Sequence, residues 1–499
     1  MATHYDLLIR DADVYDGSGA APRRADVAVE GERIALVGDA GAATAEQEVR
    51  AEGLALAPGF IDVHTHDDFA AFAHPDMGFK TRGGVTTVVV GNCGFGAAPF
   101  AEAVRMGAAL MPVSGIEPYE GHAGYARRVE QGGVGANIGM LAGHGTFRMA
   151  AMGTDQRVPD DREMAAMKGY LREALEAGVL GMSSGLIYEP GRYAETQEIA
   201  ELAAEMRGTG ALYATHMRDE AAGLLGSVRE AIEIGERAGV PVQISHHKAS
   251  GRESWGLVKD SLTLIEAAQA RGESVHADQY PYTAGSTMLR AVLQNGAFLD
   301  TPGGGGVGGS RPEDVVIASA PGHPQWEGQS IAAIAAEMGL PARDAAERVE
   351  SEAKNSSVIL HMMSEEDVRT VMRHPSTMIG SDGIPTLDGK PHPRLYNSFA
   401  RVLGHYARDE HLFSLETAVH RMTGMSAAKF GLQDRGAIAA GAFADLVLFD
   451  AATIIDRGTF ADPNRYPDGI RAVYVNGSQV VRDGAATEAR PGRVLRRAG

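Results

Sequence analysis

The sequence is poor in cysteine and in long apolar runs, and each shortage excludes a class of protein. Its 499 residues include one cysteine, Cys93, so no disulfide can form within the chain, as expected for a protein of a reducing compartment. No stretch approaches the ~18 consecutive apolar residues that a membrane-spanning helix requires. The first residues lack the basic and then apolar segments of a signal peptide. We therefore expect a cytoplasmic protein without a membrane partner.

Basic residues are also few relative to acidic ones. The chain has 46 Lys and Arg against 65 Asp and Glu, a net charge of −19. Such a surface repels phosphate backbones, so we do not expect nucleic acid as a partner. An anionic small molecule would need a local cationic pocket in this protein. A lysine or arginine beside the catalytic groups is therefore a candidate for substrate binding.

The middle of the chain alternates between short apolar segments and longer helical ones. Alternation of this kind is typical of β–α units around a parallel sheet. Eight segments are predicted as strands: GFIDVH, VTTVVVGN, NIGMLAG, GVLGMSS, LYATH, VQISH, SVHADQY and TMIGSD. Eight parallel strands, each followed by a helix, form a (β/α)8 or TIM-type barrel, which we assign to residues 57–430.

The remaining segments have a different sequence pattern. Residues 1–56 and 431–499 contain short strand-like runs separated by Gly, Pro and Asp. An insertion at about residues 287–355 is too long for an ordinary connection, and long insertions in barrels often act as lids. Its run TPGGGGVGGS cannot hold a regular element and could equally be a disordered excursion. The run SSVILHMM is interpreted as an accessory strand or as part of the insertion.

Side chains that bind metals stand at the ends of the predicted barrel strands, where barrels place their catalytic groups. His64 and His66 are two apart, so they share one face of an extended segment. Six such side chains follow five predicted strands: His64, His66, Cys93, His216, His246 and Asp382. Each one alone could be an ordinary core group. Together they are the thiolate, imidazole and carboxylate ligands that Zn²⁺ selects, and they predict a zinc centre.

These residues lie in motifs that resemble the amidohydrolase superfamily and, within it, the N-acyl-D-amino-acid deacylases (D-aminoacylases). The motifs are GFIDVHTHDD, GNCGFGAAP, SSGLIYEPGRYA, THMRDE, ISHHKASG, DQYPYTAGST and GSDG with PHPRLYNSF. The HxH motif is generic to the superfamily, whereas the cysteine motif with ISHHKASG and DQYPYTAGST is far more specific. The resemblance extends from about Tyr5 to the C-terminal strands. It implies a small β-sandwich built from both chain ends and an active-site flap formed by the insertion.

The resemblance also implies a role for individual residues. Cys93, His216 and His246 match the ligands of a tight zinc site. His64 and His66 match a second, weaker site, and Asp382 matches the catalytic aspartate. Four residues match positions that bind the α-carboxylate of the substrate: Tyr188, Lys248, Tyr280 and Ser286.

The implied reaction is zinc-dependent hydrolysis of an N-acyl-D-amino acid to the free D-amino acid and a carboxylic acid. Asp382 would take a proton from the attacking water and deliver it to the departing amine. The D-configuration rests on the resemblance alone. Lys248 is a candidate for the local cation that an acidic protein needs, or else an exposed loop lysine. Arg373 and Arg394 could serve an acidic substrate side chain, or could lie on outer helices or loops.

Two alternative functions are distinguishable in the sequence. A cyclic-amide hydrolase such as a hydantoinase or dihydroorotase would bridge two metals with a carboxylated lysine on the fourth strand. That region reads VLGMSSGLIY and has no lysine, although Cys93 is available for a bridging role. A non-catalytic oligomeric scaffold descended from such an enzyme would be expected to have lost ligands, and all six are present.

Overall fold

The computed structural model describes residues 3–108, 110, 113, 115–298 and 310–497. Eight parallel strands follow one another around a barrel in chain order, as predicted. They are β6 (Phe60–Asp62), β7 (Val85–Val90), β8 (Asn137–Gly143), β9 (Gly181–Gly185), β10 (Leu212–His216), β11 (Val242–Ile244), β12 (Val275–Gln279) and β16 (Thr377–Ile379). Most of these strands are buried throughout, as expected where helices cover a parallel sheet. A short strand, β21 (Val494–Leu495), pairs with β8.

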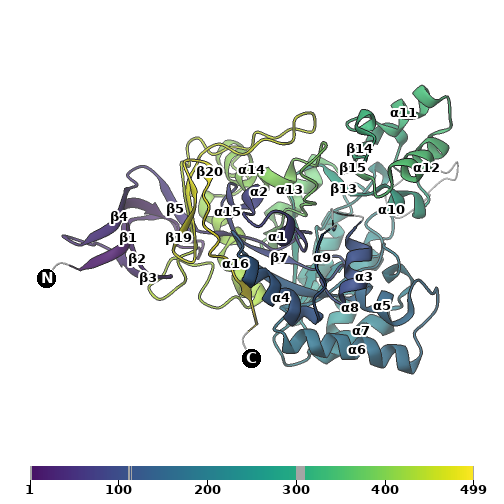
Figure 1. The fold of residues 1–499 in the computed structure, drawn as a ribbon, viewed down its shortest axis with the longest axis horizontal. Coiled ribbons are helices and arrows are strands. Elements are labelled where there is room, and N and C mark those ends of the chain that lie inside the picture. Colours follow the sequence, from purple (N-terminus) through teal and green to yellow (C-terminus); the bar gives the residue numbers. More distant parts are fainter. Residues whose placement is uncertain (1–2, 109, 111–112, 114, 299–309, 498–499) are drawn as a thin grey trace.

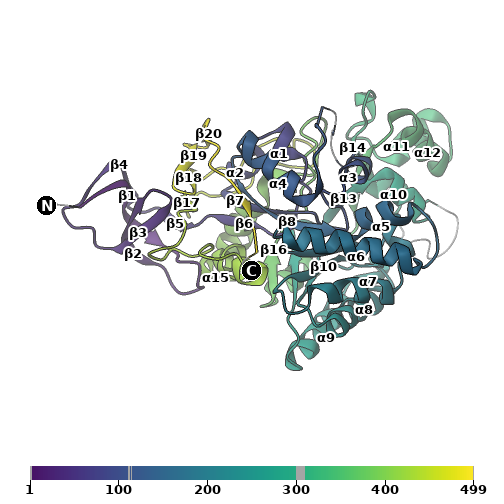
Figure 2. The same cartoon turned by 60° about the horizontal axis from the view of Figure 1, so that its bottom comes forward.

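Helices cover the outside of the barrel (Figures 1 and 2). The main ones are α4 (Gly121–Gly132), α5 (His144–Met152), α6 (Asp161–Glu176), α7 (Thr196–Ala203), α8 (Leu224–Ala238), α9 (Val258–Ala270), α13 (Glu365–Arg373), α14 (Arg394–Arg401), α15 (Leu415–Met422) and α16 (Gly424–Phe430). α6 begins with a capping box, in which Asp160 and Glu163 each accept a hydrogen bond from the other's backbone N–H. α8 ends at Gly239, which adopts the left-handed conformation that favours glycine.

The two chain ends form a sheet domain beside the barrel. Its nine strands are β1 (His4–Val14), β2 (Arg23–Glu30), β3 (Arg33–Gly38), β4 (Thr44–Arg50), β5 (Ala55–Pro58), β17 (Leu446–Phe449), β18 (Ile470–Val475), β19 (Ser478–Arg482) and β20 (Ala485–Ala486). The antiparallel pairing of β5 with β17 joins the N-terminal and C-terminal strands into one continuous sheet. Apolar side chains from both ends, such as Leu7, Val27 and Leu448, pack into one cluster inside it.

The insertion between β12 and β16 is a compact unit with its own apolar core. An antiparallel sheet of β13 (Ala284–Met288), β15 (Ser357–His361) and β14 (Val315–Ser319) packs with α10 (Leu289–Gln294), α11 (Ile331–Met338) and α12 (Ala342–Ala353). β15 confirms the accessory strand predicted in SSVILHMM. Apart from Ser310, the glycine-rich run lies outside the described residues. Both views place the insertion and the chain-end sheet at opposite ends of the molecule, with the barrel between them (Figures 1 and 2).

Among the described residues, no helix is both long and apolar enough to cross a membrane.

Candidate metal centre and active site

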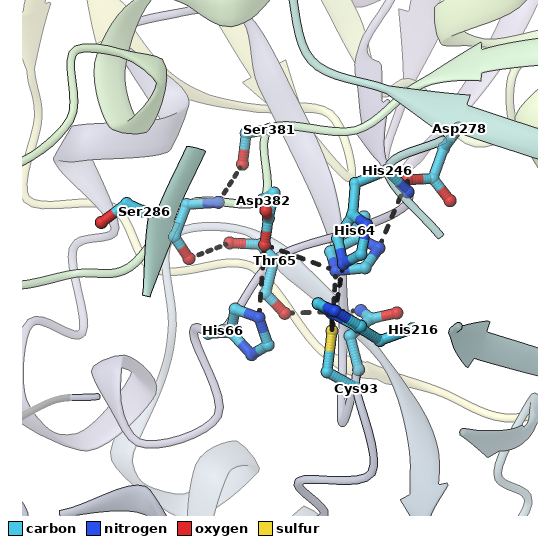
Figure 3. Close-up of polar contacts among 12 residues, drawn as sticks. His64, Thr65, His66, Cys93, His216, His246, Asp278, Ser286, Ser381 and Asp382 are labelled. Carbon is cyan, nitrogen blue, oxygen red and sulfur yellow. Dashed lines mark hydrogen bonds and ion pairs between the residues drawn. The ribbon is translucent and has the colours of Figure 1, made fainter. Parts of the chain in front are cut away.

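The six side chains predicted as a metal and catalytic cluster meet at the carboxyl ends of the barrel strands (Figure 3). His64 and His66 follow β6, Cys93 follows β7 and His216 ends β10, while His246 and Asp382 follow β11 and β16. All six are buried. Parallel strands bring their carboxyl ends to one edge of the sheet, which explains how residues far apart in sequence converge.

Cys93 lies at the centre of the histidines. Its Sγ is 3.4 Å from Nε2 of His64, 3.7 Å from Nδ1 of His216 and 3.5 Å from Nε2 of His246. Burial acts to raise the pKa of this thiol, but the charge of His64 and the hydrogen bonds from the histidines lower it well below its usual range. The thiolate, which is the form that binds metals, is therefore favoured.

Asp382 forms a second group with the histidines that follow β6. Its Oδ1 lies 3.5 Å from Nε2 of His64 and 3.3 Å from Nε2 of His66, and its Oδ2 lies 2.9 Å from Nη1 of Arg394. Burial acts to raise the pKa of Asp382, but Arg394, His246 and the hydrogen bond from His66 hold it well below its usual range. Burial acts to lower the pKa of His66, but its hydrogen bonds with Asp382 and Cys93 raise it to about 9. The site thus keeps this carboxylate ionised.

Three residues of the cluster have unusual backbone conformations. Cys93, His246 and Asp382 have φ values of 55°, 35° and 49°, in the left-handed region that non-glycine residues seldom adopt. Such strain persists only where the surrounding structure imposes it, and it gathers at functional sites. Each residue lies two or three positions after the end of a barrel strand, in the turn that brings its side chain to the cluster.

Two further carboxylates lie beside the outer nitrogens of the histidine rings. Oε1 of Glu220 lies 3.1 Å from Nδ1 of His246, and Oε2 lies 3.7 Å from Nε2 of His216. Oδ1 of Asp278 lies 3.3 Å from Nδ1 of His64. Metal-bound histidines commonly give their second nitrogen to a carboxylate of this kind. Sequence reasoning missed both carboxylates, although Glu220 lies four residues after His216 in THMRDE and Asp278 is the first residue of DQYPYTAGST.

The donor set fits zinc. One thiolate, four imidazoles and one carboxylate lie together, and subsets of three place their ligand atoms within 4.8 Å of one another. Zn²⁺ binds these three ligand types, and His64 stands between the Cys93 group and the Asp382 group. The residues could therefore hold one metal near Cys93 and a second near Asp382.

The residues predicted to bind the substrate carboxylate line one pocket with the cluster. This pocket has an empty volume of about 470 Å³, and Tyr188, Lys248, Tyr280 and Ser286 line it together with His216, His246 and Asp382. Lys248 is buried against Glu220, and its Nζ lies 2.7 Å from Oε2. Burial acts to lower the pKa of Lys248, but Glu220 raises it, so the ammonium is charged. Lys248 is therefore a buried, paired cation rather than an exposed loop lysine.

The two arginines considered for an acidic substrate side chain lie in different places. Arg394 forms the ion pair with Asp382, and its Nη2 also donates to the backbone oxygen of Ser286 at 3.2 Å. Arg373 is exposed in the last turn of α13 and does not line the pocket. Short sequence distance to the eighth strand thus placed Arg394 correctly at the site but not Arg373.

The fold and the site define a (β/α)8 barrel with a candidate metal centre at the carboxyl ends of its strands. Comparison with known proteins gives the same class. Residues 47–481 match the model of the amidohydrolase family. The D-aminoacylase of Alcaligenes xylosoxydans xylosoxydans is 43% identical over 99% of this chain and 98% of its own length. The N-acyl-D-glutamate deacylase of the same organism is 40% identical over 100% of this chain and 98% of its own.

A solved structure extends the likeness to three dimensions. The crystal structure of N-acyl-D-glutamate deacylase from Bordetella bronchiseptica, complexed with zinc and a phosphonate inhibitor, is 38% identical with a TM-score of 0.88. The match covers 99% of this chain and 100% of that one. The chain belongs to the amidohydrolase family.

Proposed function

We propose that the protein is a zinc-dependent N-acyl-D-amino-acid deacylase. It hydrolyses the amide bond of a small N-acyl-D-amino acid to a free D-amino acid and a carboxylic acid such as acetate. The observation that carries the proposal is the pocket in which Asp382 and the histidines around Cys93 face the same space as Lys248. The relatives, which are named for deacylation of D-amino acids, support both the reaction and the D-configuration. The buried free thiol of Cys93 supports a cytoplasmic location.

The metal would be held at two sites of unequal strength. Cys93, His216 and His246 would hold the tight one, and His64 and His66 with Asp382 the weaker one. When bound, zinc would polarise the amide carbonyl and lower the pKa of water at the site to roughly 7. Glu220 and Asp278 lie beside the outer nitrogens of these rings, with the shortest approach, 3.1 Å, at Nδ1 of His246, and they would favour the orientation in which the other nitrogens face the metal.

Asp382 would move the proton that the reaction requires. Arg394 holds it as a carboxylate, which can accept a proton from the attacking water. The same oxygen can then give that proton to the departing amine, which is otherwise a poor leaving group. The proton stays on the carboxylate only between these two steps, so a low pKa does not prevent the shuttle.

The pocket is lined by both polar and apolar residues, which suit the two parts of the substrate. Lys248, Tyr280, Ser286 and Tyr188 supply a cation and hydroxyl groups for the α-carboxylate. The apolar part is formed by Ile187, Ala291, Val292, Leu360 and Met362. Lys248 is the only lysine or arginine among the described residues that line the pocket, and Glu220 already pairs with it. We therefore propose that the substrate side chain is uncharged and apolar.

The two alternatives fit the site less well. The fourth barrel strand, Gly181–Gly185, carries no lysine that could be carboxylated between two metals, as a cyclic-amide hydrolase would need. A non-catalytic scaffold does not account for a buried cluster whose donors are all in place and whose carboxylate is kept ionised.

Turnover of N-acetyl-D- and N-acetyl-L-amino acids, with zinc measured on the same sample, tests the proposal. We expect hydrolysis of the D-series, at least one firmly bound zinc and loss of turnover after chelation. Equal turnover of both series would contradict the stereochemical part. Hydrolysis of hydantoin or dihydroorotate without turnover of any N-acyl-amino acid would favour the cyclic-amide alternative.

A further inference from the structure

The barrel closes in an unusual way at the point where its first and last strands meet. In the part of the chain that the structure describes, β6 and β16 form no ladder, and a single parallel bridge joins Thr65 to Gly383. Two backbone hydrogen bonds accompany it, from His66 N–H to the Gly383 oxygen at 3.0 Å and from Asp382 N–H to the His64 oxygen at 2.7 Å. The seam therefore lies within the segments that carry His64, His66 and Asp382.

A lysine from outside both strands fills this seam. Lys80, in the short helix α2 (Gly78–Thr81), donates from Nζ to Asp62 Oδ2 at 2.8 Å, to Thr65 Oγ1 at 2.9 Å and to Ser381 Oγ at 2.7 Å. Three bonds use all the donors of an ammonium group. Two partners lie on the β6 side of the seam and one on the β16 side. Asp62 completes the network by accepting from both N–H and Oγ of Ser381, at 2.8 and 2.6 Å.

The network is deeply buried and charged. The side chain of Lys80 is 1% exposed and that of Asp62 is fully buried. Burial acts to lower the pKa of Lys80, but Asp62 and Asp67 raise it, so the ammonium keeps its charge. Buried charges of this kind need complete pairing, because an unpaired one is costly. The lysine therefore cannot leave the seam without disturbing both sides of it.

Two of the three seam partners of Lys80 adjoin residues of the site. Thr65 lies between His64 and His66 in the chain, and Ser381 directly precedes Asp382; Figure 3 shows Thr65 and Ser381 beside Asp382. We propose that Lys80 is a positioning residue that sets the distance between Asp382 and the two histidines. It does so through one peptide unit on each side, in place of the strand pairing that the seam lacks. This role goes beyond the proposed reaction, which assigns nothing to Lys80.

The distinction between positioning and mere stability can be tested with a matched pair of variants. Lys80→Met removes the seam ammonium. Arg435→Met removes another buried cation, whose guanidinium pairs with Asp445. Asp445 contacts Asn137 at the start of β8, so this control lies at the end of the barrel opposite the site. Both variants should lower the melting temperature.

Only Lys80→Met should lower the rate of the reaction. Because a misplacement of about 1 Å can cost roughly 10²-fold in rate, we expect its kcat to fall by about that factor, with KM changed by less than about threefold. The tightly bound zinc should remain, whereas titration of a second equivalent should show weaker binding, because Asp382 no longer faces His64 and His66 correctly. Ser381→Ala removes only the β16 partner. It should also lower kcat while leaving KM nearly unchanged, but by a smaller factor than Lys80→Met. This variant replaces Lys80→Met in the test if the latter does not fold.

Three outcomes would overturn the proposal. They are a kcat near that of the wild type in the folded Lys80 or Ser381 variant, an equal loss in Arg435→Met, or unchanged binding of the second zinc equivalent. Absence of deacylase activity in the wild type would instead contradict the proposed function, and the zinc titration would still test the role of Lys80.

Discussion

Both carboxylate oxygens of Glu220 lie within hydrogen-bond distance of Nζ of Lys248, at 2.8 and 2.7 Å. The same carboxylate reaches the outer nitrogens of His216 and His246. One acidic side chain thus joins the candidate substrate cation to the candidate metal ligands. Because of this arrangement, a substitution of Glu220 can separate the effect of Lys248 on substrate binding from its effect on the stability of the fold.

Replacement of Lys248 by methionine should raise KM for N-acetyl-D-leucine strongly, because the α-carboxylate loses its cation. It should also cost about 3–5 kcal/mol in free energy of unfolding, since Glu220 is left buried and unpaired. Adding Glu220→Gln should recover part of that stability but not the KM. Steady-state kinetics and urea unfolding of the two variants test this. Recovery of KM in the double variant would contradict a direct role in binding.

Cys93→Ala should lose most of the bound zinc and nearly all activity, because Cys93 contacts three histidines of the cluster. His66→Asn is the matched comparison, since His66 belongs to the group around Asp382. It should keep the tight zinc and lose the second. The zinc content of the two variants after dialysis distinguishes loss of the tight zinc from loss of the second one. Full zinc content with normal turnover in Cys93→Ala would refute the assignment of the tight site.

Asp382→Asn should keep the fold and the tight zinc while kcat falls by about 10²–10⁴-fold, the usual contribution of a general acid–base group. The amide preserves the shape of the carboxylate but cannot shuttle a proton. Activity within a few-fold of the wild type would exclude the shuttle. A variant that is inactive and also free of zinc would make Asp382 a principal metal ligand instead.

The strands and the metal cluster could be predicted because their signals are local. Each β–α unit shows its own change of pattern, and β10 begins and ends as the LYATH segment predicts. The positions of His216 and Asp382 then follow from the rule that barrel strands end at the site. Local patterns cannot show which side chains meet across the barrel.

The residues that sequence analysis missed depend on contacts between distant segments. Lys80 reaches Ser381 across most of the chain, and Asp278 reaches His64 from another strand. The position of Arg394 depends on such a contact as well. Its guanidinium forms an ion pair with Asp382, a contact that only the folded structure reveals.

Stability should fall as the pH drops from about 6.5 to about 4, in part because of His276. Burial, with Lys429 and His374 nearby, lowers the pKa of His276 from 6.5 to about 4. Between these values the unfolded chain binds a proton that the folded chain does not, so acid favours unfolding. From pH 7.5 to 4.5, His276→Gln should lose about 1–2 kcal/mol less free energy of unfolding than the wild type. Equal losses in urea titrations would contradict this.

The apolar lining of the pocket should decide which D-amino acid is accepted. Ile187, Leu360 and Met362 belong to the apolar lining, and Glu220 already pairs with Lys248, the only lysine or arginine among the described residues of the lining. A second substrate carboxylate would be desolvated there without a partner, at a cost of at least about 3 kcal/mol. N-acetyl-D-leucine should therefore exceed N-acetyl-D-glutamate in kcat/KM by at least about 10²-fold, since 1.36 kcal/mol is a factor of ten.

A new cation in this lining should reverse part of that preference. Met362 is partly exposed, so Met362→Lys can be accommodated, and it should raise kcat/KM for N-acetyl-D-glutamate about tenfold or more while lowering it for N-acetyl-D-leucine. Met362→Gln, of similar length but uncharged, is the control. It should lower kcat/KM for N-acetyl-D-leucine without raising it for N-acetyl-D-glutamate. A wild type that prefers N-acetyl-D-glutamate would mean that Lys248 or Arg394 gives up its carboxylate partner when substrate binds.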